Sequence, residues 1–259
     1  MGKPVAAIPA IFFLVFAVLS FSAFGGPLED KLFAAIDARY SEDGDGEDNL
    51  DDIAKLFDDG AKVSARNSEG GTPLFLAVDA GDVALVELLL QKKADVNLAD
   101  KEGDTALLIA SQRGNLEIIE ILVQKGADVS VRNKEGYSSL FLAAQQGNLE
   151  AVSFLLDKGA DPNSKGPVDV TPLMATTDPD IVKALIDKGA DVNARSATGM
   201  TPLMYACLTL GNSDVAATLL EKGADPNAKA NNGVSASLLA GLIGDKKTMA
   251  LLNKPGGKK

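Results

Sequence analysis

An acidic stretch near the amino terminus, SEDGDGEDNLDD at residues 41–52, holds the carboxylates that come closest to a metal-site pattern in this chain. Carboxylates bind calcium, but an EF-hand loop begun at Asp43 would also need glycine at its sixth position and glutamate at its twelfth. Those positions hold Asp48 and Ala54, so the motif fails. We interpret the stretch as a solvated acidic loop, with weak divalent-cation binding as the alternative.

The sequence lacks the residues and motifs that usually support nucleophilic catalysis. The chain lacks histidine, so a serine or cysteine nucleophile would lack its usual activating base. No phosphate-binding loop, G-x-S-x-G elbow or S-x-x-K motif is present. The single cysteine, Cys207, excludes an intrachain disulfide and falls at a small-residue position inside an expected helix. We interpret it as a packed core thiol, with a reactive thiol as the alternative, and expect no enzyme, cofactor or metal.

The charge balance disfavours polyanionic partners. Asp and Glu number 36 against 25 Lys and Arg, which gives a formal net charge of -11. Such a field repels phosphate backbones, so we expect no nucleic-acid partner and no attraction to anionic membranes. Hydrophobic residues make up 46% of the chain, as in folded domains.

Residues 1–25 have the layout of a secretory signal peptide. Lys3 precedes an apolar run from about Val5 to Phe24, and small residues suit cleavage after Ser22 or Gly25. An uncleaved membrane anchor is the alternative, because the run approaches the roughly 20 residues that span a bilayer. A cytosolic protein is the third interpretation. The first two place the rest of the chain outside the cytoplasm.

A six-residue phrase returns along the chain, mostly at intervals of about 33 residues. Its copies are TPLFLA (72–77), TALLIA (105–110), SSLFLA (138–143), TPLMAT (171–176), TPLMYA (201–206) and SASLLA (235–240). Each begins with a hydroxyl residue that can cap the first turn of a helix. A glycine expected to end this first helix follows at Gly81, Gly114, Gly147, Gly211 and Gly244.

A second helix is expected in each unit, because apolar residues recur at helical spacing up to another glycine. These glycines are Gly60, Gly126, Gly159, Gly189 and Gly223. A turn of the form Ala-Asp-(Val/Pro)-Asn follows, with serine in place of the last asparagine at Ser130. Neither helix can bury its apolar face alone, so the units must stack into one continuous core.

The period and the phrase order resemble the ankyrin repeat over about residues 29–254. The resemblance implies an all-α solenoid of about seven stacked helix-turn-helix units with hairpin loops. We expect an N-terminal capping repeat with an acidic insertion at 29–66, five repeats at 67–229 and a C-terminal capping repeat at 230–254. Residues 255–259 are expected to form a disordered tail.

Several positions depart from the family pattern. The histidine usual at the fourth place of the phrase is replaced by apolar residues, which we assign to Phe75, Leu108, Phe141, Met174, Met204 and Leu239. Lys93 stands where the second helix should end in glycine. The repeat at 166–195 is shorter than its neighbours, which predicts a shortened first helix with a bend at Asp178-Pro179. That shortening is either drift in a tolerant loop or a binding notch.

Ankyrin proteins typically bind other proteins through the hairpin tips and the ends of the first helices. At the tips the matching residues are Glu69, Lys101, Glu102, Lys134 and Glu135. On the inner face they are Asp79, Gln112, Arg113, Gln145, Gln146 and Thr209. Ordinary solvated surface is the alternative interpretation of each.

The sequence and the resemblance together predict an exported, non-enzymatic protein-binding module. It would be a monomer that acts as scaffold, inhibitor or protector of a partner outside the cytoplasm, in the periplasm or secreted, and the bare build resembles bacterial ankyrin proteins. A membrane-tethered ankyrin protein and, more remotely, a divalent-cation-binding protein using the acidic loop are the alternatives. The partner's identity does not follow from the residues.

Overall fold

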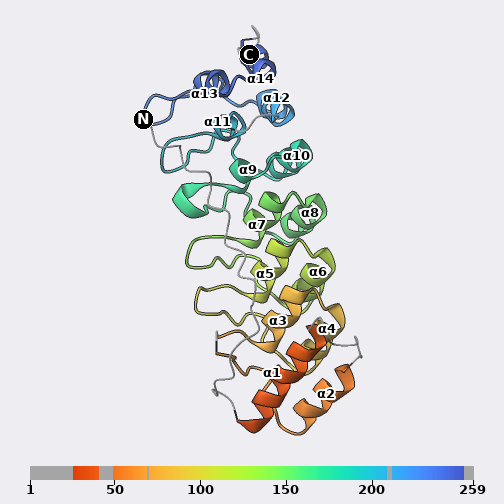
Figure 1. Ribbon diagram of the computed structural model, residues 1–259. Coiled ribbons are helices and arrows are strands. Elements are labelled where there is room, and N and C mark those ends of the chain that lie inside the picture. Colours follow the sequence, from red (N-terminus) through yellow and green to blue (C-terminus); the bar gives the residue numbers. More distant parts are fainter. Residues whose placement is uncertain (1–25, 41–48, 69, 209–211, 254–259) are drawn as a thin grey trace.

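The computed structural model describes residues 26–40, 49–68, 70–208 and 212–253, and within them it is an all-α repeat solenoid. Seven helix pairs are stacked in chain order, with the N-terminal pair at one end and the C-terminal pair at the other (Figure 1). Each helix contacts its partner in the pair and the equivalent helix of the next pair. The apolar core therefore runs along the stack.

The two helices of each pair form two parallel columns (Figure 1). The first helices are α1 (Pro27–Tyr40), α3 (Pro73–Ala80), α5 (Ala106–Arg113), α7 (Ser139–Gln146), α9 (Pro172–Ala175), α11 (Pro202–Ala206) and α13 (Ala236–Ile243). The second helices are α2 (Leu50–Asp58), α4 (Val83–Gln91), α6 (Leu116–Gln124), α8 (Leu149–Asp157), α10 (Pro179–Asp187), α12 (Ser213–Glu221) and α14 (Lys246–Leu252).

Hairpin loops connect one pair to the next. Isolated antiparallel bridges close three of them, at Ala99–Thr105, Arg132–Ser138 and Lys229–Ser235. A 3₁₀ turn, η1 (Pro167–Asp169), lies in the hairpin of the short repeat. The hairpins project from the side of the first helices (Figure 1).

All the predicted starts of the first helices are confirmed, and the predicted side-chain cap is confirmed at all but one. The hydroxyl of the capping residue accepts a backbone N–H three residues on at Thr72, Thr105, Ser138, Thr201 and Ser235. Thr171 is the N-cap residue of α9, but its predicted capping bond is absent, because its hydroxyl is buried with no hydrogen-bond partner. The N–H of Met174 donates instead to the Thr171 carbonyl at 2.9 Å. This bond tightens the first turn and takes the donor that the Thr171 hydroxyl would otherwise accept.

Glycine ends the first helices α3, α5, α7 and α13 as predicted, and Gly211 lies outside the described residues. The predicted glycines after the second helices, Gly60, Gly126, Gly159, Gly189 and Gly223, have positive φ, and Lys93 takes their place after α4. Its φ is 65°, whereas the equivalent Gly126 after α6 has a φ of 94°. A lysine in this left-handed region carries a backbone cost of about 1 kcal/mol that glycine avoids. The interpretation of Lys93 as a glycine position is thus confirmed.

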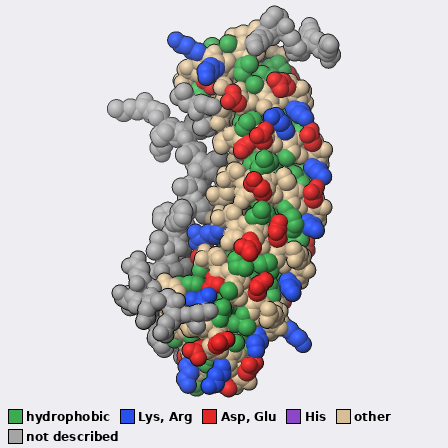
Figure 2. Space-filling model, turned by 90° about the vertical axis from the view of Figure 1, so that its right-hand side faces the viewer, with side chains coloured by type: hydrophobic (Ala, Val, Ile, Leu, Met, Phe, Trp, Pro, Cys, Tyr) green, Lys and Arg blue, Asp and Glu red, His purple; other side chains and the backbone are tan. Residues whose placement is uncertain are grey.

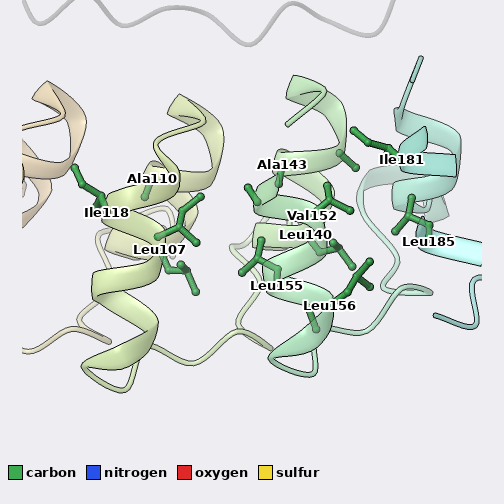
Figure 3. Close-up of a cluster of buried hydrophobic side chains, with 14 of the residues drawn as sticks. Leu107, Ala110, Ile118, Leu140, Ala143, Val152, Leu155, Leu156, Ile181 and Leu185 are labelled. Carbon is green, nitrogen blue, oxygen red and sulfur yellow. The ribbon is translucent and has the colours of Figure 1, made fainter. Parts of the chain in front are cut away.

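The main core is built from buried apolar side chains of neighbouring pairs. Figure 3 shows apolar side chains of three neighbouring pairs, from Leu107 through Leu155 to Leu185, gathered between the helices. Leu155 and Leu185 are fully buried, as are Leu89 and Leu219 at the same place in other pairs. The core thus continues through the whole described stack.

Apolar packing does replace the missing histidines. Leu108, Phe141 and Met174 belong to a second buried cluster on the hairpin side, where the Tyr137 and Phe141 rings lie 5.3 Å apart. The assignment of Leu239 to this series is wrong. The N-cap hydroxyl of Ser235 accepts from Leu238, so Leu238 holds the fourth place, and it is 49% exposed in the last pair.

Two first helices are short. Helix α9 ends at Ala175, and Asp178 then caps α10 through the N–H groups of Asp180 and Ile181, as the bend at Asp178-Pro179 predicted. Helix α11 ends at Ala206, so the placement of Cys207 inside a helix is wrong, and it is the C-cap residue. Its side chain is nevertheless fully buried.

Candidate protein-binding surface

The ends of the first helices bring five of the predicted contact residues into one row. Asp79, Gln112 and Gln145 occupy equivalent places on α3, α5 and α7, which pack side by side. Arg113 and Gln146 follow on α5 and α7 and are exposed. We call these five residues the helix-end row.

An ion pair links two repeats within the helix-end row. The Arg113 Nε donates to Asp79 Oδ1 at 2.7 Å, and its Nη2 lies 2.6 Å from the same oxygen. Both side chains are partly exposed, so the pair is worth little in stability. Its main effect is to hold the arginine along the row, toward the amino-terminal end of the stack.

The hairpin tips align as a second row of predicted residues. Lys101, Glu102, Lys134 and Glu135 are all exposed. The Lys134 N–H donates to the Glu102 carbonyl at 2.9 Å, and the Lys134 ammonium contacts the Lys101 carbonyl. These backbone contacts set the spacing of the two tips at one repeat. Glu69 and Thr209, the remaining predicted residues, lie outside the described residues.

The short repeat presents an apolar tip that the sequence reasoning missed. Val168 is 67% exposed and takes φ 49° and ψ 35° in η1, a conformation that costs a β-branched residue about 1–3 kcal/mol. Its carbonyl accepts the Ala197 N–H of the next hairpin at 2.9 Å, which helps to hold it there. The shortened repeat was the only signal in the sequence, and it does not predict this backbone.

The residues with catalytic or metal potential are not assembled into a site in the described chain. Burial, and secondarily the charge of Asp245, raises the pKa of Cys207 to about 12, so its thiol stays protonated. Over the described ranges no three His, Cys, Asp or Glu side chains are grouped to hold a metal ion. Most of the acidic stretch, residues 41–48, lies outside those ranges.

The comparison with protein families decides what these stacked pairs are. A family model described as ankyrin repeats, in three copies, matches residues 46–133, 74–166 and 140–230. Together the overlapping matches span well over half of the chain. The chain belongs to the ankyrin repeat family. A search of curated proteins finds no match.

The opposite face of this ankyrin array is formed by the second helices and carries charges of both signs. Figure 2 shows acidic and basic side chains interspersed along its length. Ion pairs join consecutive second helices at Lys92–Asp58, Lys188–Asp157 and Lys222–Asp187. None of the helices in the described parts of the array is both long and apolar enough to cross a bilayer.

Proposed function

We propose that this ankyrin repeat protein is exported and binds one other protein outside the cytoplasm, as its scaffold, inhibitor or protector. Ankyrin repeats indicate a protein–protein interaction module, and proteins built from them are generally non-enzymatic scaffolds. Binding would use the helix-end row and the hairpin tips, without a cofactor and with the array acting as a monomer.

The observation that carries the proposal is the alignment of polar side chains that the fold does not need. Gln112 and Gln145 sit at equivalent places on adjacent first helices, and Gln146 is exposed beside them. Rigid stacking fixes their spacing, so a partner meets a preorganised surface and loses little freedom in adapting to it. Four hairpin tip residues extend the same array with both charge signs, which favours selectivity of the partner.

Affinity capture from the extracytoplasmic fraction of the source cell tests the surface. The bait is the wild type, and the test variant changes Gln112, Arg113, Gln145 and Gln146 to alanine. Glu117 and Glu150 are exposed on the neighbouring second helices α6 and α8, so their double alanine variant is a matched control. We expect one protein to be held by the wild type and the control and lost by the test variant.

Retention of that protein by all three baits, or by none, contradicts the helix-end row. Because Arg113→Ala also removes the contact with Asp79, the melting temperatures of the baits are compared first. A test variant that melts within about 2 °C of the wild type shows that loss of capture is not loss of fold.

Export is tested separately by sequencing the amino terminus of the protein isolated from its source. Support for export comes from the apolar run between Val5 and Phe24, which Lys3 precedes and small residues follow. We expect the mature chain to begin at residue 23 or 26 and to be released from membranes. A chain that keeps residues 1–25 and sediments with membranes is the tethered alternative.

The cation-binding alternative has its own measurement. If the acidic stretch at 41–52 binds calcium in the folded state, millimolar calcium raises the melting temperature, because a ligand that binds only the native state stabilises it. We expect no calcium-dependent rise. A clear rise that EDTA reverses would favour the alternative.

A further inference from the structure

Asparagine side chains bridge consecutive repeats of the array at one recurring place. The Asn97 Nδ2 donates to the Gly126 carbonyl at 3.0 Å, and its Oδ1 accepts the Asp128 N–H at 2.8 Å. The same two bonds recur at Asn163 with Gly189 and Asp191, and at Asn193 with Gly223 and Asp225. In each case one primary carboxamide satisfies one backbone acceptor and one backbone donor of the next repeat.

Two junctions among the described repeats lack this bridge, because serine replaces the asparagine at Ser64 and at Ser130. The second of them lies between α6 and α8. Ser130 takes the place of the asparagine, and its hydroxyl donates back to Asp128 Oδ1 in its own loop at 2.6 Å. The groups that an asparagine would have bonded are the Gly159 carbonyl and the Asp161 N–H. Within the described residues neither has a hydrogen-bond partner, so a donor and an acceptor stay available side by side.

A groove opens at this same junction. It has a volume of about 410 Å³, and Ser130 and Asp161 both line it. Leu140 contributes an apolar wall, and Arg132 and Lys165 flank it with cationic side chains. The Arg132 guanidinium donates to the Lys165 carbonyl, which ties the two walls together. The volume falls in the range of small-ligand and side-chain pockets.

The Gly159 carbonyl and the Asp161 N–H together determine which chemical group can bind, because a ligand must offer them both a donor and an acceptor. A carboxylate has no donor for the Gly159 carbonyl, and an ammonium has no acceptor for the Asp161 N–H. A primary carboxamide has both on one planar group, and three bridges elsewhere in the array show that it fits this pair of backbone groups.

We propose that the Ser130 gap is a binding site for a primary carboxamide, supplied by an asparagine or glutamine side chain of a peptide. The groove gives the peptide backbone room between the two repeats, and Leu140 covers its apolar part. Small free amides share this chemistry and are the other source to distinguish.

The site is separate from the helix-end row. The two helices of a pair are antiparallel, so the loop after α6 lies at the opposite end of the pair from Gln112 (Figure 1). The capture experiment above can therefore fail while this site binds, and the reverse also holds.

An NMR titration of the ¹⁵N-labelled protein tests the proposal. The probe is asparagine blocked at both termini by acetyl and methylamide groups, and the matched control is blocked aspartate. With the asparagine probe we expect a saturable downfield shift of the Asp161 amide proton resonance. The aspartate probe should bind at least about tenfold more weakly, because the Gly159 carbonyl would face a group with no donor. Propionamide forms a third arm.

Two variants make the result specific to the gap. Ser130→Asn fills it, so its Asp161 resonance should begin downfield and the probe should no longer shift it. Ser130→Ala leaves the gap open and should titrate like the wild type. No saturable shift at Asp161, equal affinity for the two blocked residues, or undiminished binding to Ser130→Asn would each overturn the proposal. Propionamide that binds as tightly as the blocked asparagine would overturn the peptide source and assign the site to free amides.

Discussion

The junction between α6 and α8 differs from the junction between α10 and α12 in its polar contacts and not in its core. At the second junction Asn193 bridges to Gly223, and Lys222 pairs with Asp187 at 2.6 Å. At the first, Ser130 and Gln124 stand at those two places, and neither contact forms. Leu122, Leu155, Leu185 and Leu219 are nevertheless all fully buried.

The difference separates two roles in the array. The apolar side chains specify the stack, because every pair needs its neighbours to cover them. The polar bridges tune each junction locally, and one can be absent without opening the core. A junction without its bridge leaves backbone groups available to a ligand.

The largest expected change in the free energy of unfolding comes from core substitutions, which test whether the two junctions share one core. Leu155→Ala and Leu219→Ala each remove a fully buried side chain at the same place in different pairs. Each should lower the free energy of unfolding by about 2–5 kcal/mol, from lost burial plus the cavity left behind. Urea unfolding followed by circular dichroism measures both. A loss under about 1 kcal/mol at Leu155 alone would contradict the shared core.

Removing a bridge should make the second junction resemble the first. Asn193→Ser leaves the Gly223 carbonyl and the Asp225 N–H without their partner, which should cost about 1–2 kcal/mol in urea unfolding. It should also create a carboxamide response at the Asp225 N–H in the same NMR titration. Lost stability without that response would mean that the bridge is structural only.

Adding a bridge is the reverse change. Ser130→Asn should raise the free energy of unfolding by about 1 kcal/mol, the net value of a typical hydrogen bond. Thermal melting compares it with Ser130→Ala, which adds no bridge. Equal melting temperatures for the two variants would show that the gap cannot accept an asparagine.

The end of α4 offers a backbone test at a third junction. Lys93→Gly should stabilise the protein by about 1 kcal/mol, because glycine adopts the φ of 65° without its steric cost. Lys93→Ala keeps the strain and is the control for loss of the charge. A melting temperature lowered by Lys93→Gly would contradict the assignment of position 93 as a strained position that favours glycine.

The smallest effect concerns the pH dependence of stability at the N-terminal end of the array. There Arg39 and Tyr40 of α1 donate hydrogen bonds to the Asp82 carboxylate that caps α4. Burial acts to raise the pKa of Asp82, but its bonds to Arg39 and to the Leu85 N–H outweigh it, so the folded-state pKa is below the ordinary value. The stabilisation is therefore present above about pH 4 and lost as the pH falls through the folded pKa. Between pH 5 and 3 the melting temperature should fall less in Asp82→Asn than in the wild type; equal slopes would exclude the contribution.

How much the sequence predicted depends on whether a position repeats. Thr72, Thr105 and Ser138 recur in one phrase, so their capping role follows from helix chemistry alone. The exceptions occur where a repeat is irregular. The buried hydroxyl of Thr171 and the left-handed Val168 both lie in the short repeat, where neighbouring repeats decide the backbone.

The polar surface was less predictable than the helices. The sequence shows serine at 64 and 130 where four other repeats have asparagine. The bridge to the next repeat, however, is a contact across about 30 residues that no local pattern reveals. The positions of the helix-end row follow from the resemblance, whereas the contact of Arg113 with Asp79 needed the structure. Helix periodicity fixes which residues are aligned, and only stacking fixes which of them touch.

Site-specific photocrosslinking in the source cell shows whether the array binds a protein through the helix-end row. A photoreactive residue replaces Gln146 at the end of α7 or, as the control, Glu150 on α8; both positions are exposed and lie in one helix pair. We expect one covalent adduct of defined mass from position 146 and none from position 150. No adduct from position 146, or the same adducts from both, would contradict binding through the helix-end row.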